Sequence, residues 1–140
     1  MFSVDLSTRE CGGHVVVALR GELDIADAAA VAAALAAVAA REPQIIVDLS
    51  GLEFIDCSGV AALARGRKHA QHAGGDLVLA APRQFVLRVL TMTRLTDEFG
   101  VHATVEKAVS GEYPRPAAVP VPRRPGRMGW PRTAMRWPGS

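Results

Sequence analysis

Residues 45–60 constrain the fold more than any other stretch of this sequence. They begin as an apolar, β-branched run, Ile45-Ile46-Val47, which is typical of a strand buried on both faces. They end in Asp56-Cys57-Ser58-Gly59, immediately before a helical pattern. The hydroxyl of Ser58 is therefore expected at the start of a helix, where unpaired N–H groups and the helix dipole favour a phosphate. The simpler interpretation is that Ser58 only caps that helix.

The apolar periodicity on either side predicts alternating strands and helices. The predicted strands cover residues 2–8, 14–19, 44–49, 76–80 and 99–102. The predicted helices cover residues 26–41, 59–73, 82–92 and 104–109. Gly12-Gly13 predicts a tight turn that pairs the first two strands antiparallel. The rest of the order is typical of an α/β fold with crossover helices, so the sheet is expected to be mixed.

Each predicted helix has an apolar stripe that is expected to face the sheet. In the first helix, which Asp24 is predicted to cap, this stripe is Val31, Leu35 and Val38. In the second it is Val60, Leu63, Gly66, Ala70 and Ala73, with Arg65, Lys68, His69 and His72 on the outer side. In the third it is Phe85, Val86, Val89 and Leu90, with Pro82 opening the helix, and Thr104 is predicted to cap the fourth.

The charge is divided unevenly along the chain. Residues 1–110 hold ten Lys and Arg against thirteen Asp and Glu, whereas residues 111–140 hold six Arg and one Glu. The second segment also contains seven of the nine prolines and both tryptophans, a composition typical of disorder. We therefore expect one folded domain, residues 1–110, and a disordered tail, residues 111–140. A basic arm that contacts an acidic partner, nucleic acid or lipid is the alternative for the tail.

Several classes of protein are disfavoured by what the sequence lacks. It has no apolar run long enough to span a membrane and no signal peptide, and its two cysteines form no CxxC motif. A cytoplasmic protein is therefore expected. There is no phosphate loop, the residues around Ser58 lack the first glycine of a hydrolase elbow, and His69 and His72 lack a third metal ligand. Cys57 is either a reactive thiol or, as we expect, a partly buried filler. No cofactor and no metal are predicted.

Three segments of the sequence resemble the STAS domain family, and within it the anti-sigma factor antagonists. They are Gly-Glu-Leu-Asp at residues 21–24, Val-Asp-Leu-Ser-Gly-Leu-Glu-Phe-Ile-Asp-Cys-Ser-Gly at residues 47–59, and Gly-Gly-Asp-Leu-Val at residues 74–78. The resemblance covers roughly residues 2–110 and omits the tail. It implies a STAS-like mixed sheet of about four to six strands covered by crossover helices.

The resemblance also implies a function that is not enzymatic. Ser58 matches the residue that an anti-sigma factor with serine kinase activity phosphorylates, and Cys57 stands where the family often has a second serine. The unphosphorylated protein would bind the anti-sigma factor and free a sigma factor, and a serine phosphatase would reverse the modification. The partner-binding residues implied are Asp24, Asp56, Cys57, Ser58 and Gly59, in a pathway such as a stress response, without direct nucleic-acid binding. Weak self-association stays open.

Two other functions compete with this one. Some STAS proteins are regulatory subunits of transporters or of stress-signalling complexes, without phosphorylation. A hydrolase or redox enzyme that uses Ser58 or Cys57 is the third alternative. Transfer of one phosphate to Ser58 by a kinase would favour the switch, and turnover lost on Ser58→Ala or Cys57→Ala would favour an enzyme.

Overall fold

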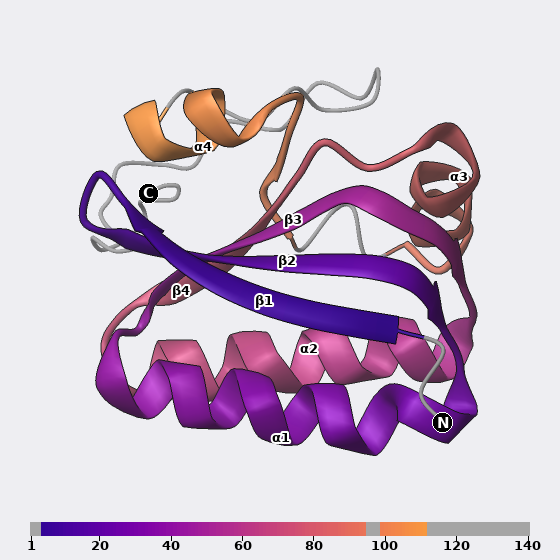
Figure 1. The fold of residues 1–140 in the computed structure, drawn as a ribbon, viewed down its shortest axis with the longest axis horizontal. Helices are drawn as coiled ribbons and strands as arrows, with labels where there is room; N and C mark the ends of the chain where they lie inside the picture. The colour runs from indigo at the N-terminus through magenta and orange to yellow at the C-terminus, as the bar shows by residue number, and fades with distance from the viewer. Residues whose placement is uncertain (1–3, 95–98, 112–140) are drawn as a thin grey trace, which may run out of the picture.

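The computed structural model describes residues 4–94 and 99–111 and has a five-stranded mixed sheet (Figure 1). The strands are β1 (Val4–Cys11), β2 (His14–Leu23), β3 (Gln44–Ile55), β4 (Asp76–Ala80) and β5 (Val101–His102), and they lie side by side in this order. Only β1 runs antiparallel to its neighbour; the other three pairings are parallel. This confirms the predicted α/β fold with a mixed sheet.

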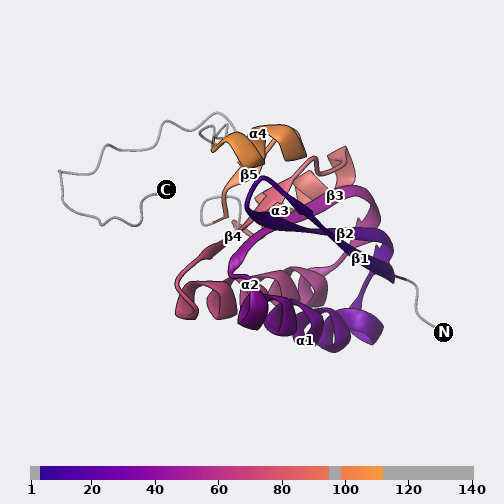
Figure 2. The ribbon, with the colours of Figure 1, turned by 60° about the vertical axis from the view of Figure 1, so that its left-hand side comes forward.

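The helices alternate with the strands, as the periodicity predicts. They are α1 (Ile25–Arg41), α2 (Cys57–His72), α3 (Gln84–Met92) and α4 (Val105–Ser110). Helices α1 and α2 cover one face of the sheet, and α4 lies over the other face (Figures 1 and 2). We call these faces the α1–α2 face and the α4 face.

The main core lies between the sheet and the helices that follow its strands. The predicted stripe of α1, Val31, Leu35 and Val38, is buried there. Four of the five stripe residues of α2 are also buried, but Ala73, which caps the end of that helix, is exposed. A second, smaller cluster lies under α4, where Val105 and Ala108 pack on Val16, Ile46 and Ala80.

Helices α1 and α2 pack unusually close together at Gly66. A Cβ atom added to Gly66 would lie 2.6 Å from Cδ1 of Leu35 and 2.9 Å from its Cβ. Contacts this short do not occur between real side chains, so only glycine allows Leu35 to sit against the backbone of α2. The predicted stripe of small residues therefore fixes how near the two helices approach.

The tight turn between β1 and β2 has the geometry that two glycines favour. Gly12 has φ +57° and Gly13 has φ +82°, which is the type I′ pattern of a two-residue hairpin. The first strand runs from Val4 to Cys11, so it continues three residues past its predicted end. Residues 2 and 3, which were also predicted to be strand, lie outside the described residues.

Strands β2 and β3 are both longer than predicted. Residues 50–55, which lie beyond the predicted end of β3 at residue 49, are strand, because the extension of β2 to Leu23 supplies their partners. Gly51 pairs with Arg20 and Ile55 pairs with Leu23; the register shifts once just before Arg20 and again between Gly21 and Glu22. Ser50-Gly51 resembles a turn in sequence but forms part of this irregular pairing.

The remaining boundaries differ by a few residues. Helix α2 begins at Cys57 instead of residue 59, and α3 begins at Gln84 instead of Pro82. Strand β5 is only two residues long, and Phe99, which was expected to begin it, is buried in the main core. The predicted cap of α4 is confirmed, because Oγ1 of Thr104 accepts the N–H of Lys107 at 3.1 Å. The predicted tail covers residues 111–140. Apart from Gly111, it lies outside the described residues.

Candidate functional site

Helices α1 and α2 begin side by side at the end of the sheet that is formed by the carboxyl ends of β2 and β3. Ile55 pairs with Leu23, and the N–H of Asp56 donates to the carbonyl of Leu23 at 3.3 Å. Asp24 and Asp56 each follow one of these strands. The pairing therefore brings together the two acidic residues that the family resemblance implies, although they are 32 positions apart in the sequence.

Each aspartate caps the helix that follows it. Oδ1 of Asp24 accepts the N–H of Ala26 at 3.0 Å, and Oδ1 of Asp56 accepts the N–H of Gly59 at the same distance. The predicted cap at Asp24 is confirmed. The interpretation of Ser58 as the cap of α2 is wrong, because Asp56 occupies that position. An aspartate just before an apolar stripe was the available signal, and it is the same signal that identified Asp24.

Ser58 lies in the first turn of α2 and binds the capping carboxylate. Its Oγ donates to Oδ1 of Asp56 at 2.6 Å, the short distance expected for a hydroxyl on a charged acceptor. This hydrogen bond is the main reason why the pKa of Asp56 lies below its ordinary value; the N–H of Gly59 lowers it further, while partial burial opposes the shift. The carboxylate is thus ionised at neutral pH, and the half-buried hydroxyl is held against it.

Gly59 is buried where α2 meets the ends of β2 and β3. A Cβ atom there would lie 2.7 Å from Cγ1 of Ile55 and 2.9 Å from the carbonyl oxygen of Leu23. Only glycine therefore allows the helix to begin this close to the strands. That is a packing reason for Gly59, and its contact with a partner stays a prediction.

Cys57 is the first residue of α2 and is exposed, so the expectation of a partly buried filler is wrong. Its side chain lies at the surface next to Ser58 in the sequence. His69 and His72 are also exposed, as are Arg65 and Lys68, which confirms the predicted outer face of α2. Among the residues that the structure describes, no group of three His, Cys, Asp or Glu side chains is placed to hold a metal ion.

The sequence did not reveal an exposed aromatic pair near this edge. Phe54 is 37% exposed and Phe85 is 44% exposed, and their rings stack with centroids 5.6 Å apart. Phe85 was expected in the core, but Val86 and Leu90 fill the buried side of α3. Two other large apolar side chains, Ile25 and Met92, are even more exposed. Side chains alternate between the two faces of a strand. If β3 had been predicted to extend to Ile55, Phe54 would therefore have been placed on the face opposite buried Ile55.

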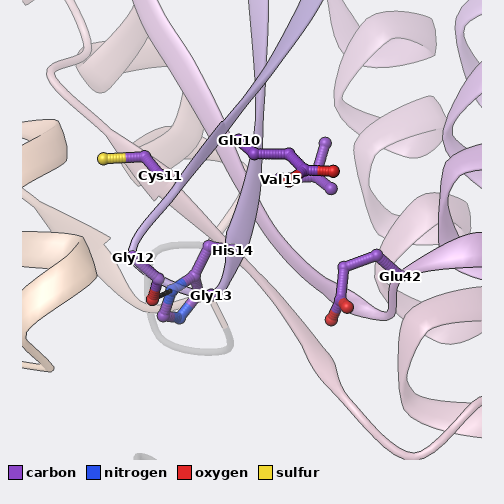
Figure 3. A pocket seen from close by; sticks show the side chains of 7 residues that line it. All are labelled: Glu10, Cys11, Gly12, Gly13, His14, Val15 and Glu42. Carbon is purple, nitrogen blue, oxygen red and sulfur yellow. Dashed lines mark hydrogen bonds between the residues drawn. The ribbon is translucent and has the colours of Figure 1, made fainter.

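A polar pocket lies at the opposite end of β2, around the turn at Gly12 and Gly13 (Figure 3). It has a volume of about 240 Å³ and is lined by Glu10 and Glu42 among others. His14 also lines it, with Nδ1 lying 3.1 Å from the carbonyl oxygen of Gly12. None of the predicted site residues lines this pocket, so it is separate from the site at Ser58.

Fold and site together define a small α/β domain with one serine hydroxyl, held on a capping carboxylate, just beyond the carboxyl end of its central strand β3. Within the two described segments, no helix is long and apolar enough to cross a membrane. Comparison with known proteins agrees with this class. Residues 5–108 match the family model of the STAS domain.

Relatives identify the branch of that family. The anti-sigma-F factor antagonist RsfA of Mycobacterium tuberculosis is 35% identical over 100 residues, which are 69% of this chain and 77% of RsfA. The crystal structure of an anti-sigma factor antagonist from Mycobacterium paratuberculosis has 28% identity and a TM-score of 0.70, over 77% of this chain and 92% of that one. This chain therefore belongs to the STAS domain family, among the anti-sigma factor antagonists.

A third relative, the anti-sigma factor antagonist SpoIIAA, has been solved in two chemical states. Its unphosphorylated form has a TM-score of 0.63 with 24% identity, over 76% of this chain and 94% of SpoIIAA. The phosphorylated form, from Bacillus, has a TM-score of 0.57 with 23% identity, over 76% of this chain and 97% of that one. At this level of identity the likeness shows a shared fold.

Proposed function

We propose that this anti-sigma factor antagonist is switched by phosphorylation of Ser58. The unmodified protein binds an anti-sigma factor that is also a serine kinase, and so frees a sigma factor. Phosphorylation weakens that binding, and a serine phosphatase restores it. The protein is a substrate and a binding partner in this cycle, acts in the cytoplasm, and catalyses no reaction.

The hydrogen bond from Ser58 to Asp56 is the observation that carries the proposal. It holds the only hydroxyl of the first turn of α2 at the edge of the sheet, between exposed Cys57 and buried Gly59. The family to which the chain belongs includes SpoIIAA, which exists in phosphorylated and unphosphorylated forms. A phosphate on Ser58 would carry about −1.5 to −2 charges.

Because the carboxylate of Asp56 lies beside Ser58, phosphorylation of Ser58 should make the free energy of partner binding less favourable. The carboxylate is 2.6 Å from the Ser58 oxygen, so a phosphate attached there meets a like charge and must turn outward, away from Oδ1. The dipole of α2 partly stabilises the phosphate in the free protein. A partner that covers the site would have to desolvate both charges, and a loss of about 1.4 kcal/mol already weakens binding tenfold.

The proposed partner surface surrounds this serine. It includes Asp24 and Asp56, which begin the adjacent helices, together with Cys57 and the backbone at Gly59. Ile25, the first residue of α1, is 79% exposed and adds an apolar side chain beside Asp24. Association commonly buries such exposed apolar groups inside a polar rim.

Titration of the kinase partner against the wild-type protein and two variants tests the proposal. We expect Ser58→Ala to bind with or without ATP, and the wild type to lose affinity once the kinase has added one phosphate. Ser58→Asp should bind more weakly than Ser58→Ala, but better than the phosphorylated protein, because a carboxylate carries less charge. High salt should reduce the difference if charge repulsion dominates.

Ser50→Ala is the matched control, because Ser50 is an exposed serine on the neighbouring strand β3. It should behave as the wild type in every arm. Equal affinity of the wild-type, Ser58→Ala and Ser58→Asp proteins for the partner would remove Ser58 as the switch. That result, together with a stable complex that resists ATP, would favour the alternative of an unphosphorylated regulatory subunit.

A further inference from the structure

Strand β1 forms one edge of the sheet, and no other strand of the described chain pairs with its outer side. At eight residues it is longer than an average strand, so it offers a long row of unpaired backbone groups. The side chains of Asp5, Ser7 and Arg9 are exposed on the α4 face, opposite Arg20, Ala18 and Val16 of β2. Leu6 and Thr8 point to the α1–α2 face.

The turn at Gly12 and Gly13 determines which backbone groups are free. In an antiparallel pair with a two-residue turn, the residues flanking the turn exchange both of their hydrogen bonds, and the pattern alternates from there. Cys11 pairs with His14 across this turn, so the odd-numbered residues of β1 bond to β2. The N–H and C=O groups of Val4, Leu6, Thr8 and Glu10 therefore point outward from the sheet.

We propose that this edge binds a second copy of the same chain, with the two β1 strands antiparallel about a two-fold axis at Ser7. In such a pairing, residues whose backbone groups point out of the sheet must face one another across the interface. The two-fold axis must therefore pass through a residue and not between two residues, which leaves Leu6, Ser7 or Thr8 near the middle of β1. An axis at Ser7 pairs the whole of residues 4–10 with its copy. It also joins the two sheets into one continuous sheet.

The charges of β1 complement one another only in this register. With the axis at Ser7, Asp5 of each chain lies opposite Arg9 of the other, on the α4 face where both are exposed. Leu6 faces Thr8, and Val4 faces Glu10, so no like charges meet. Charged side chains on an edge strand usually prevent pairing. Here their opposite signs, two residues on either side of Ser7, favour pairing with a second copy.

The proposed dimer does not depend on the proposed switch. The dimer is made by β1, whereas Ser58 follows β3 and β2 lies between these two strands, so each dimer would carry two switch sites. A pairing through one strand is small, so we expect a weak, concentration-dependent dimer.

Disulfide trapping tests the register. In the full chain with Cys11→Ala and Cys57→Ser, Ser7→Cys should form a covalent dimer on mild oxidation, because the residues on the axis are a close, non-hydrogen-bonded pair. Thr8→Cys is the matched control: it is exposed, keeps both charges, but faces Leu6 on the other side of the sheet. Equal cross-linking at both positions, or none at position 7, would overturn the proposed register.

Charge reversal tests the surface independently, by sedimentation velocity over a range of concentrations. Asp5→Arg or Arg9→Asp alone places two like-charge pairs in the dimer and should weaken association about tenfold or more. Mixing the two variants restores both opposite pairs, so the mixture should dimerise where each variant alone does not. Both positions are exposed, so circular dichroism should show an unchanged fold.

Two results would contradict the dimer itself. A wild-type protein that stays monomeric at the highest soluble concentration would show that the edge charges protect a monomer. A dimer that ignores both charge reversals would use another surface.

Discussion

The hydroxyl of Ser58 and the N–H of Gly59 bind the same oxygen atom, Oδ1 of Asp56, at 2.6 Å and 3.0 Å. One carboxylate oxygen thus caps α2 and also holds the serine that we propose as the switch. A chemical change at Ser58 therefore acts directly on the helix cap, without any relay through the core.

The first prediction concerns the pKa of Asp56. Ser58→Ala removes the largest cause of its lowering, so that pKa should rise toward its ordinary value. Because the folded pKa lies below the unfolded one, ionised Asp56 stabilises the fold above the unfolded pKa of about 3.9, and this stabilisation is lost as the pH falls through the folded pKa. In Ser58→Ala the stabilisation should be smaller, and its loss should be complete at a higher pH than in the wild type.

Carboxyl carbon chemical shifts, followed by NMR from about pH 2 to 6, measure this pKa directly. Ser50→Ala serves as the control and should leave it unchanged. If the pKa of Asp56 were the same in the wild type and in Ser58→Ala, the hydrogen bond between them would not exist in solution.

Asp24→Ala should impair partner binding or phosphorylation more than it impairs folding. The lost cap costs about 1 kcal/mol of unfolding free energy, which a domain of this size can usually absorb. Urea unfolding measures the first effect, and kinase assays with partner titration measure the second. Phosphorylation and affinity both at wild-type values would leave Asp24 with a capping role alone.

Phe85→Ala should weaken partner binding about tenfold, while the loss of its stacking on Phe54 costs about 1 kcal/mol of stability. The reason is that the ring is 44% exposed and stacks on Phe54, which lies two residues before Asp56, the cap of α2. Gln84→Ala, at the neighbouring exposed position of α3, is the control. Calorimetry that gave both variants the affinity of the wild type would place the aromatic pair outside the interface.

Gly59→Ala should destabilise the fold by about 1–3 kcal/mol, the usual cost of overpacking. The added methyl would meet the carbonyl oxygen of Leu23, which is backbone and cannot rotate away. Cys57→Ala, two residues earlier and exposed, should change the unfolding free energy by much less. Equal denaturation midpoints for these two variants would show that α2 can shift away from the sheet at little cost.

The last prediction concerns the domain boundary. A protein that ends at Gly111 should unfold as cooperatively as the full chain, because the described core lies before that residue. Gly111 is kept because it ends α4 in the left-handed conformation, with φ +77°. A melting temperature well below that of the full chain would mean that residues 112–140 contribute to the folded domain.

Much of this fold could be predicted from patterns of local sequence. The stripe of α1 at Val31, Leu35 and Val38 and the glycine turn at Gly12 and Gly13 carry their structural preference in their own residues. The extension of β3 could not be predicted in this way, because its partners come from β2, some thirty residues earlier. Long-range pairing overrode the turn that Ser50-Gly51 suggests locally.

Only the part of the candidate site that depends on local sequence could be predicted. Ser58 and Asp56 are close in sequence, and the strand-to-helix pattern around them identified the region. The stacking of Phe85 on Phe54 depends on how α3 lies beside the end of β3, so helical periodicity alone assigned Phe85 to the wrong side.

The close contact of Gly66 with Leu35 bears on how the proposed switch at Ser58 would affect a partner. Leu35 of α1 fills the place that a side chain at position 66 would take, so α2 has no room to move closer to α1 at this point. If Ser58 is phosphorylated as we propose, we expect the phosphate to alter the electrostatic potential at the surface more than the packing of α2 on α1. On this proposal the partner senses charge instead of conformation, and its response requires no slow rearrangement of the domain.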